Sequence, residues 1–129
     1  MQSIFNMITK IMSSTISGLF PQLVHVEVSI QKGLPKFEVV GLGQSAVKEG
    51  RDRIMTAIKS SGYSLDAKRI IANLAPASLR KDGSSLDLPI ALGVLSGNDF
   101  LDSMLLEGIV VAGELASEGT IQPIRGICA

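Results

Sequence analysis

The chain has 129 residues, of which 46% are apolar and 19% are charged. This composition predicts one soluble globular domain and excludes a disordered chain. Twelve lysines and arginines balance twelve aspartates and glutamates, which excludes both the net basic field that drives non-specific nucleic-acid binding and a solvating acidic tail.

Three strands are predicted in the first third of the chain. Residues 8–17 are rich in β-branched side chains, and Gly18 ends the strand. Residues 24–30 read Val-His-Val-Glu-Val-Ser-Ile, a strict alternation that is typical of a half-buried strand. After a turn at 31–35, residues 36–40 form the third strand. We expect these strands to make an antiparallel meander.

A helix is predicted from Ser45 to Ser61, because apolar residues recur there at helical spacing; they are Val47, Ile54, Ala57 and Ile58. Gly62 is placed to end this helix as a C′ glycine. Opposite charges lie four residues apart on the expected solvent face, and the pairs are Lys48 with Asp52 and Glu49 with Arg53.

The second half of the chain predicts a short buried strand at 69–74 and a loop at 75–85. An apolar helix then starts at Leu86 or Asp87 and runs to Leu95, with Pro89 in its first turn. Strands at 109–113 and 120–124 are joined by a hairpin-like turn at 117–119. The order β-β-β-α-β-α-β-β predicts an α+β fold, a two-layer sandwich.

Several kinds of site are excluded or disfavoured by the residues present. The sequence contains no GxxxxGK[ST] loop, and Gly41-Leu-Gly43 lacks the third glycine of a dinucleotide fingerprint, so it predicts only a tight turn. His25 and Cys128 are the single histidine and cysteine, too few for a zinc site or an internal disulfide. We therefore expect a reducing, cytoplasmic location. No apolar run is long enough to span a bilayer, and the first residues do not resemble a signal peptide.

The loop Lys81-Asp-Gly-Ser-Ser85 precedes the apolar helix. A serine at this position could act as a nucleophile if a lysine or histidine took its proton. Alternatively, Ser84 or Ser85 caps the helix, since Ser84 and Asp87 have the spacing of a capping box. The sequence leaves both interpretations open, with capping favoured.

Cations are concentrated in the middle of the chain, and those that could contact phosphates are Arg51, Arg53, Lys68, Arg69, Arg80 and Lys81. Carboxylates are interleaved with them, so a solvated face is the alternative interpretation.

Five segments of the chain resemble the ComM/YifB family of magnesium-chelatase-like (ChlI-like) AAA+ proteins. They are Gly33–Gly41, Ala46–Arg53, Asn73–Ala77, Lys81–Leu92, and Gly113-Glu-Leu together with Gly119–Gly126. The resemblance runs from about Met7 to Cys128, so residues 1–6 are expected to be an extension. Residues 7–129 are expected to be the N-terminal Lon-like domain of a longer protein.

The resemblance implies the ribosomal-protein-S5-domain-2-like fold that the Lon proteolytic domain shares. Ser85 then matches the Lon nucleophile, but Cys128 stands where the catalytic lysine is expected. Asp87 replaces a Lon glycine and would oppose a developing oxyanion. The resemblance therefore implies a degenerate serine site with no catalytic residues. Gly43-Gln44 also departs from the Pro-Asp that often follows Gly41-Leu42 in the family.

The resemblance also implies that ATP and magnesium belong to a following AAA+ module, absent from these 129 residues. Related ComM proteins are hexameric DNA helicases that promote branch migration in natural transformation. We therefore expect a non-catalytic module whose partners are its own AAA+ module, DNA, or further copies of the protein, and no membrane. Two alternatives remain: a residual hydrolase with Ser85 and Lys81, or a pure interaction domain whose helix 45–61 docks onto the AAA+ module.

Overall fold

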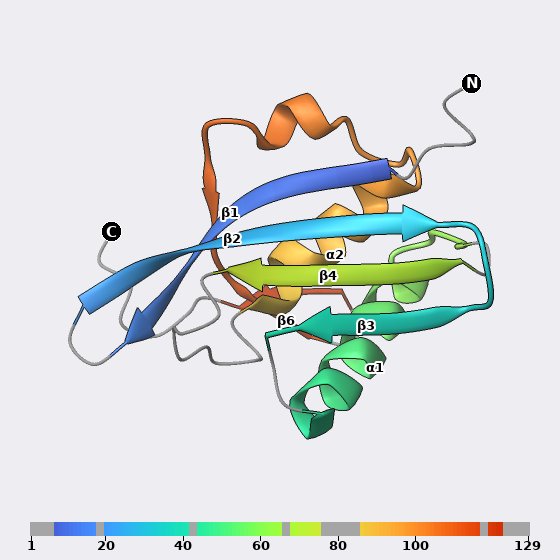
Figure 1. Cartoon of the computed structure of the whole chain (residues 1–129), viewed down its shortest axis with the longest axis horizontal. Helices are drawn as coiled ribbons and strands as arrows, with labels where there is room; N and C mark the ends of the chain where they lie inside the picture. The colour runs from blue at the N-terminus through green and yellow to red at the C-terminus, as the bar shows by residue number, and fades with distance from the viewer. Residues whose placement is uncertain are drawn as a thin grey trace.

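A five-stranded sheet carries both α-helices on one of its faces (Figure 1). This computed structural model describes residues 7–17, 20–41, 44–65, 68–75, 86–116 and 119–122. The elements in chain order are β1 (Met7–Ser17), β2 (Phe20–Gln31), β3 (Lys36–Val40), α1 (Gln44–Ser60), β4 (Arg69–Ala75), α2 (Asp87–Gly97), the 3-10 helix η3 (Ser103–Leu106), β5 (Val110–Val111), β6 (Glu114–Leu115) and β7 (Ile121–Gln122). The predicted α+β two-layer class is confirmed.

The sheet order β3-β4-β2-β1-β5 contradicts the predicted meander. β1 and β2 are antiparallel neighbours as expected, but β4 lies between β2 and β3, antiparallel to the former and parallel to the latter. The reason is that α1 carries the chain back, so that β4 enters beside β3 in the same direction. β3 is left as an edge strand, which suits its charged residues Lys36 and Glu38.

The prediction of two strands after α2 is also wrong, because the described residues of this region already form three. Residues 109–113 supply only the two-residue β5, which joins β1 in parallel. The hairpin instead pairs β6 with β7, and it is closed by hydrogen bonds between Ala116 and Thr120 (2.9 Å) and between Gly119 and Ala116 (2.8 Å). The small β6–β7 sheet contacts the helical layer through β6.

The core lies between the sheet and the two helices, as the alternation of β2 predicts. Val24, Val26 and Val28 are completely buried, and α1 adds its predicted apolar stripe. Of that stripe, the side chain of Val47 lies outside the described residues. α2 lies close against β2, and two glycines permit this approach. A Cβ on Gly93 would collide with Val28, and one on Gly97 would collide with Ile30.

The end of α1 has the predicted glycine geometry. Gly62 has a φ of 95°, its N–H donates to the Lys59 carbonyl at 3.0 Å, and the Tyr63 N–H donates to the Ile58 carbonyl at 3.2 Å. This pattern of bonds is a Schellman motif, which satisfies carbonyls that the helix leaves unpaired. In the described part of the chain, neither helix is long and apolar enough to cross a membrane.

Candidate functional site

The start of α2 is held by an ion pair that joins it to α1. Arg53 Nε donates to Asp87 Oδ2 at 2.6 Å, and the Asp87 side chain is only 3% exposed. Arg53 reaches this carboxylate from the same helix that buries Ile54 in the core. The short charge-assisted bond fixes the two helices to one another where the polypeptide leaves the 76–85 loop.

A glycine lets α1 approach this carboxylate. Gly50 is buried on α1, one turn before Arg53, and a Cβ there would lie 3.1 Å from Asp87 Oδ1. Such a separation is shorter than most contacts that a Cβ makes in proteins. Gly50 and Arg53 therefore form one side of the site and Asp87 forms the other.

The charges around Arg53 stabilise its cation. The pKa of Arg53 is raised above its ordinary value chiefly by the hydrogen bond to Asp87. The charges of Asp87, Glu49 and Glu114 act in the same direction, and partial burial acts against them. Glu114 belongs to β6, so α1, α2 and the small sheet converge on a single guanidinium.

This arrangement corrects one expectation. The solvent-face pairs Lys48–Asp52 and Glu49–Arg53 do not form ion pairs within the described residues; Asp52 pairs with Arg51 at 3.4 Å and Arg53 pairs with Asp87. The expected opposition of the Asp87 carboxylate to an oxyanion at Ser85 stays a prediction, because Ser85 lies outside the described residues. A pattern of charges four residues apart could not reveal a partner 34 positions away.

The loop residues of the expected peptidase site lie outside the described residues. They include Arg80, Lys81, Ser84 and Ser85, as well as Cys128 near the end of the chain. Neither the capping box nor the nucleophile position has a described geometry. What the structure does place is Asp87, directly after this loop, in a buried ion pair.

The expected nucleic-acid contacts are divided between the two faces of the sheet. Arg51 and Arg53 lie on α1, on the helix side. Arg69 begins β4, whose alternate residues from Ile70 onward are buried on that side, so Arg69 points to the outer face. Lys68 directly precedes it.

On the outer face, Arg69 shares the carboxylate of Glu38 with Lys36. The distances to Glu38 Oε1 are 3.1 Å from Lys36 Nζ and 3.4 Å from Arg69 Nη2. The pKa of Glu38 is lowered, mainly by the hydrogen bond to Lys36. The Nε atom of Arg69 is buried with no hydrogen-bond partner.

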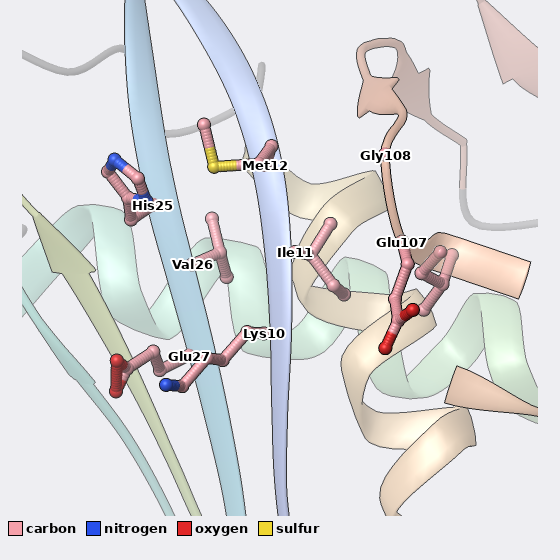
Figure 2. A pocket seen from close by; sticks show the side chains of 9 residues that line it. Lys10, Ile11, Met12, His25, Val26, Glu27, Glu107 and Gly108 are labelled. Atoms are coloured by element: carbon pink, nitrogen blue, oxygen red, sulfur yellow. The ribbon is translucent and has the colours of Figure 1, made fainter. Parts of the chain in front are cut away.

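A small hollow of about 170 Å³ lies where β1 passes residues 106–108 (Figure 2). His25 and Met12 stand side by side on one side of the strands, and Glu107 lies on the other side of β1. The exposed His25 is on the polar face of β2, as its alternation predicts. Within the described ranges no three histidine, cysteine or acidic side chains are grouped to hold a metal ion.

Comparison with known proteins identifies the family. The family model described as subunit ChlI of Mg-chelatase matches residues 26–129. The chain belongs to the ChlI family. Among curated ChlI-type relatives, the uncharacterized protein YifB of Escherichia coli is 46% identical over 103 residues, covering 80% of this chain and 20% of YifB.

Two other relatives match a similar share of the chain. Competence protein ComM of Haemophilus influenzae is 41% identical over 110 residues, covering 85% of this chain and 22% of ComM. An uncharacterized protein of Mycobacterium tuberculosis is 36% identical over 115 residues, covering 89% of this chain and 23% of its own length. The ChlI-family chain thus spans about a fifth of the length of these curated relatives.

Proposed function

We propose that this chain is the non-catalytic N-terminal module of a longer magnesium-chelatase-like AAA+ ATPase of the ComM/YifB type. The family match supports this assignment, as does the length of the relatives, of which the matched segment makes up only 20% in YifB and 22% in ComM. In the proposal, the whole protein works in the cytoplasm on DNA during competence; the name of one relative, competence protein ComM, supports the link to competence.

The buried Arg53–Asp87 pair is the observation that carries the non-catalytic part of the proposal. Asp87 follows the serine position by two residues and is buried against Arg53 at 2.6 Å. A carboxylate held in this way cannot leave its place to accept a proton without breaking the ion pair with the partly buried Arg53. The pair supports a structural role for the α2 start, namely to hold the two helices in one arrangement.

Nucleotide and magnesium are assigned in this proposal to the AAA+ module. The 129 residues contain no GxxxxGK[ST] loop, whose backbone amides and lysine hold the phosphates of a bound nucleotide. The described residues also offer no group of three acidic or histidine side chains for a metal. The residues present therefore do not fit either cofactor, and no chemical step is derived through them.

The role of the module in the whole protein is to support assembly or contact with DNA. If DNA is bound, Arg69 presents a cation on the outer face, with Lys68 directly before it in the chain, while Arg51 lies on the helical side. Among the predicted arginine contacts that the structure describes, Arg53 is the least exposed, and its guanidinium is committed to Asp87.

The test combines the reading frame with a covalent probe. We expect the gene to continue beyond the codon for Ala129 into a GxxxxGK[ST] loop, and the full-length product to hydrolyse ATP. We expect a serine-directed fluorophosphonate to leave this chain unlabelled at pH 9. Labelling that is lost in Ser85→Ala but kept in Ser84→Ala would establish the residual hydrolase instead. A stop codon at position 130 would refute the ATPase assignment.

A further inference from the structure

The turn between β2 and β3 carries an apolar side chain that packs against nothing. Leu34 is 87% exposed, more than any other large hydrophobic residue in the described part of the chain. Lys32 and Lys36 flank it, and both are exposed. We call residues 32–35 the tip. Its residues 33–35 lie within Gly33–Gly41, a segment on which the family resemblance rests, although Leu34 is not part of the core.

The tip is fixed at its base. Gln31 at the end of β2 and Lys36 at the start of β3 both pair with Arg69 of β4. The Lys36 N–H also donates to the Lys68 carbonyl at 3.4 Å, and Pro35 restricts the backbone next to Leu34. Because the tip is already ordered, binding through it costs little conformational entropy.

A hollow with complementary character lies at the same end of the molecule. Its volume is about 360 Å³, and it is formed by the start of β1 and the loop between α2 and η3. Ile8 and Leu101 supply the apolar part of a lining that is otherwise polar, and Asp99 and Asp102 supply carboxylates, of which Asp102 also accepts the Met104 N–H at 3.0 Å. Both carboxylates belong to exposed residues. The hollow therefore fits an apolar side chain that is accompanied by a cation.

The strand register places the tip and the hollow at one end of the sheet. Ile8 of β1 pairs with Ser29 of β2, and β2 ends two residues later, immediately before the tip. In Figure 1 the start of β1 and the β2–β3 turn lie at the same side of the molecule. When two complementary features share one end, a single two-fold axis allows each copy to present one feature and to receive the other.

We propose that the chain forms a two-fold dimer in which Leu34 of each copy enters the hollow of the other, with Lys32 beside Asp99 and Asp102. Within the described residues Lys32 makes no ion pair, so its charge is available. The two carboxylates of the hollow disfavour a nucleic acid at this end, because they would repel phosphates. A second copy supplies both the leucine and the cation. This dimer does not depend on the ATPase assignment.

Sedimentation equilibrium of the 129-residue chain tests the dimer. We expect a monomer–dimer equilibrium with a dissociation constant below about 1 mM, weakened by salt. Leu34→Ser should raise this constant about tenfold or more, a loss of about 1.4 kcal/mol. The matched control is Leu23→Ser, which removes an exposed leucine from the opposite end of β2 and should leave the constant unchanged.

A double-mutant cycle tests the charge contact. Lys32→Glu and Asp99→Asn should each raise the dissociation constant of the dimer. The fold increase in the double variant should be smaller than the product of the two single increases. Asparagine is chosen because Asp99 has a φ of 65°, which asparagine tolerates. Lys48→Glu on α1 is the charge control and should have no effect. A chain that stays monomeric at about 1 mM, or equal effects of Leu34→Ser and Leu23→Ser, would overturn the proposal.

Discussion

Two carboxylates on opposite sides of the sheet each share an ion pair with an arginine, yet their surroundings differ. Asp87 lies in the helical layer, 3% exposed and 2.6 Å from Arg53. Glu38 lies on the outer face, 31% exposed, with Arg69 at 3.4 Å and Lys36 at 3.1 Å. Water replaces a lost partner at Glu38 but cannot do so at Asp87. The carboxylate–arginine pair at Asp87 therefore holds α1 and α2 together, whereas the pair at Glu38 contributes little to stability.

The largest expected effect is the removal of Arg53. Arg53→Met leaves Asp87 buried without its cation, so we expect a loss of about 3 kcal/mol in the free energy of unfolding, at the low end of the range for a broken buried pair because Arg53 is partly exposed. Urea denaturation measures this loss from the midpoint and slope. The matched control is Arg51→Met, two residues away, whose partner Asp52 is exposed. Equal losses in the two variants would mean that the Arg53 pair is no stronger than a surface pair.

A smaller effect is expected at Gly50. A Cβ at this position would lie 3.1 Å from Asp87 Oδ1, so the carboxylate must give by a few tenths of an ångström in Gly50→Ala, which disturbs its bond to Arg53. Overpacking of this kind costs about 1–3 kcal/mol, and the better helix propensity of alanine returns up to about 1 kcal/mol. We therefore expect a net loss of about 1 kcal/mol in urea denaturation. A more stable Gly50→Ala protein would show that the close approach of the helices is not required.

The smallest effect is expected at Glu38. Glu38→Gln should lower the urea midpoint at pH 7 only slightly, because the ion pairs are solvated and screened by salt. The pKa of Glu38 in the folded protein lies below its ordinary value of 4.5. The stability it contributes is thus present above pH 4.5 and is lost as the pH falls through the folded pKa. The difference in the free energy of unfolding between wild type and Glu38→Gln should therefore disappear as the pH falls through this interval. A difference that grows in acid would contradict this assignment.

Local patterns predicted most of the individual elements. The alternation of residues 24–30 gave β2 its buried face, and the spacing of Ile54, Ala57 and Ile58 located α1. Gly62 ended that helix as expected, with its positive φ. These signals are reliable because each depends on neighbours within a few residues: a strand alternates at every second position, and a helix repeats every 3.6.

The errors concerned pairing between distant segments. A strand such as β3 has the same sequence whether it pairs with β2 or with β4, and only the return of the chain through α1 decides between them. The segment 109–113 forms only the short β5, and β6 begins just after it at Glu114, for a similar reason: the pairing of these two strands depends on β1 and β7 rather than on their own residues.

The candidate site shows the same contrast between local patterns and contacts of distant segments. The sequence by itself placed Asp87 at the start of an apolar helix, two residues after Ser85, and it established the kinship to the ChlI family through long ordered motifs. Only the tertiary structure brought Arg53 across 34 positions to Asp87, because the contact exists only when both helices are packed on the same face of the sheet. The tertiary structure also separated Arg53 from Arg69. Arg53 lies on α1, which packs on one face of the sheet, whereas the side chain of Arg69 points to the other face.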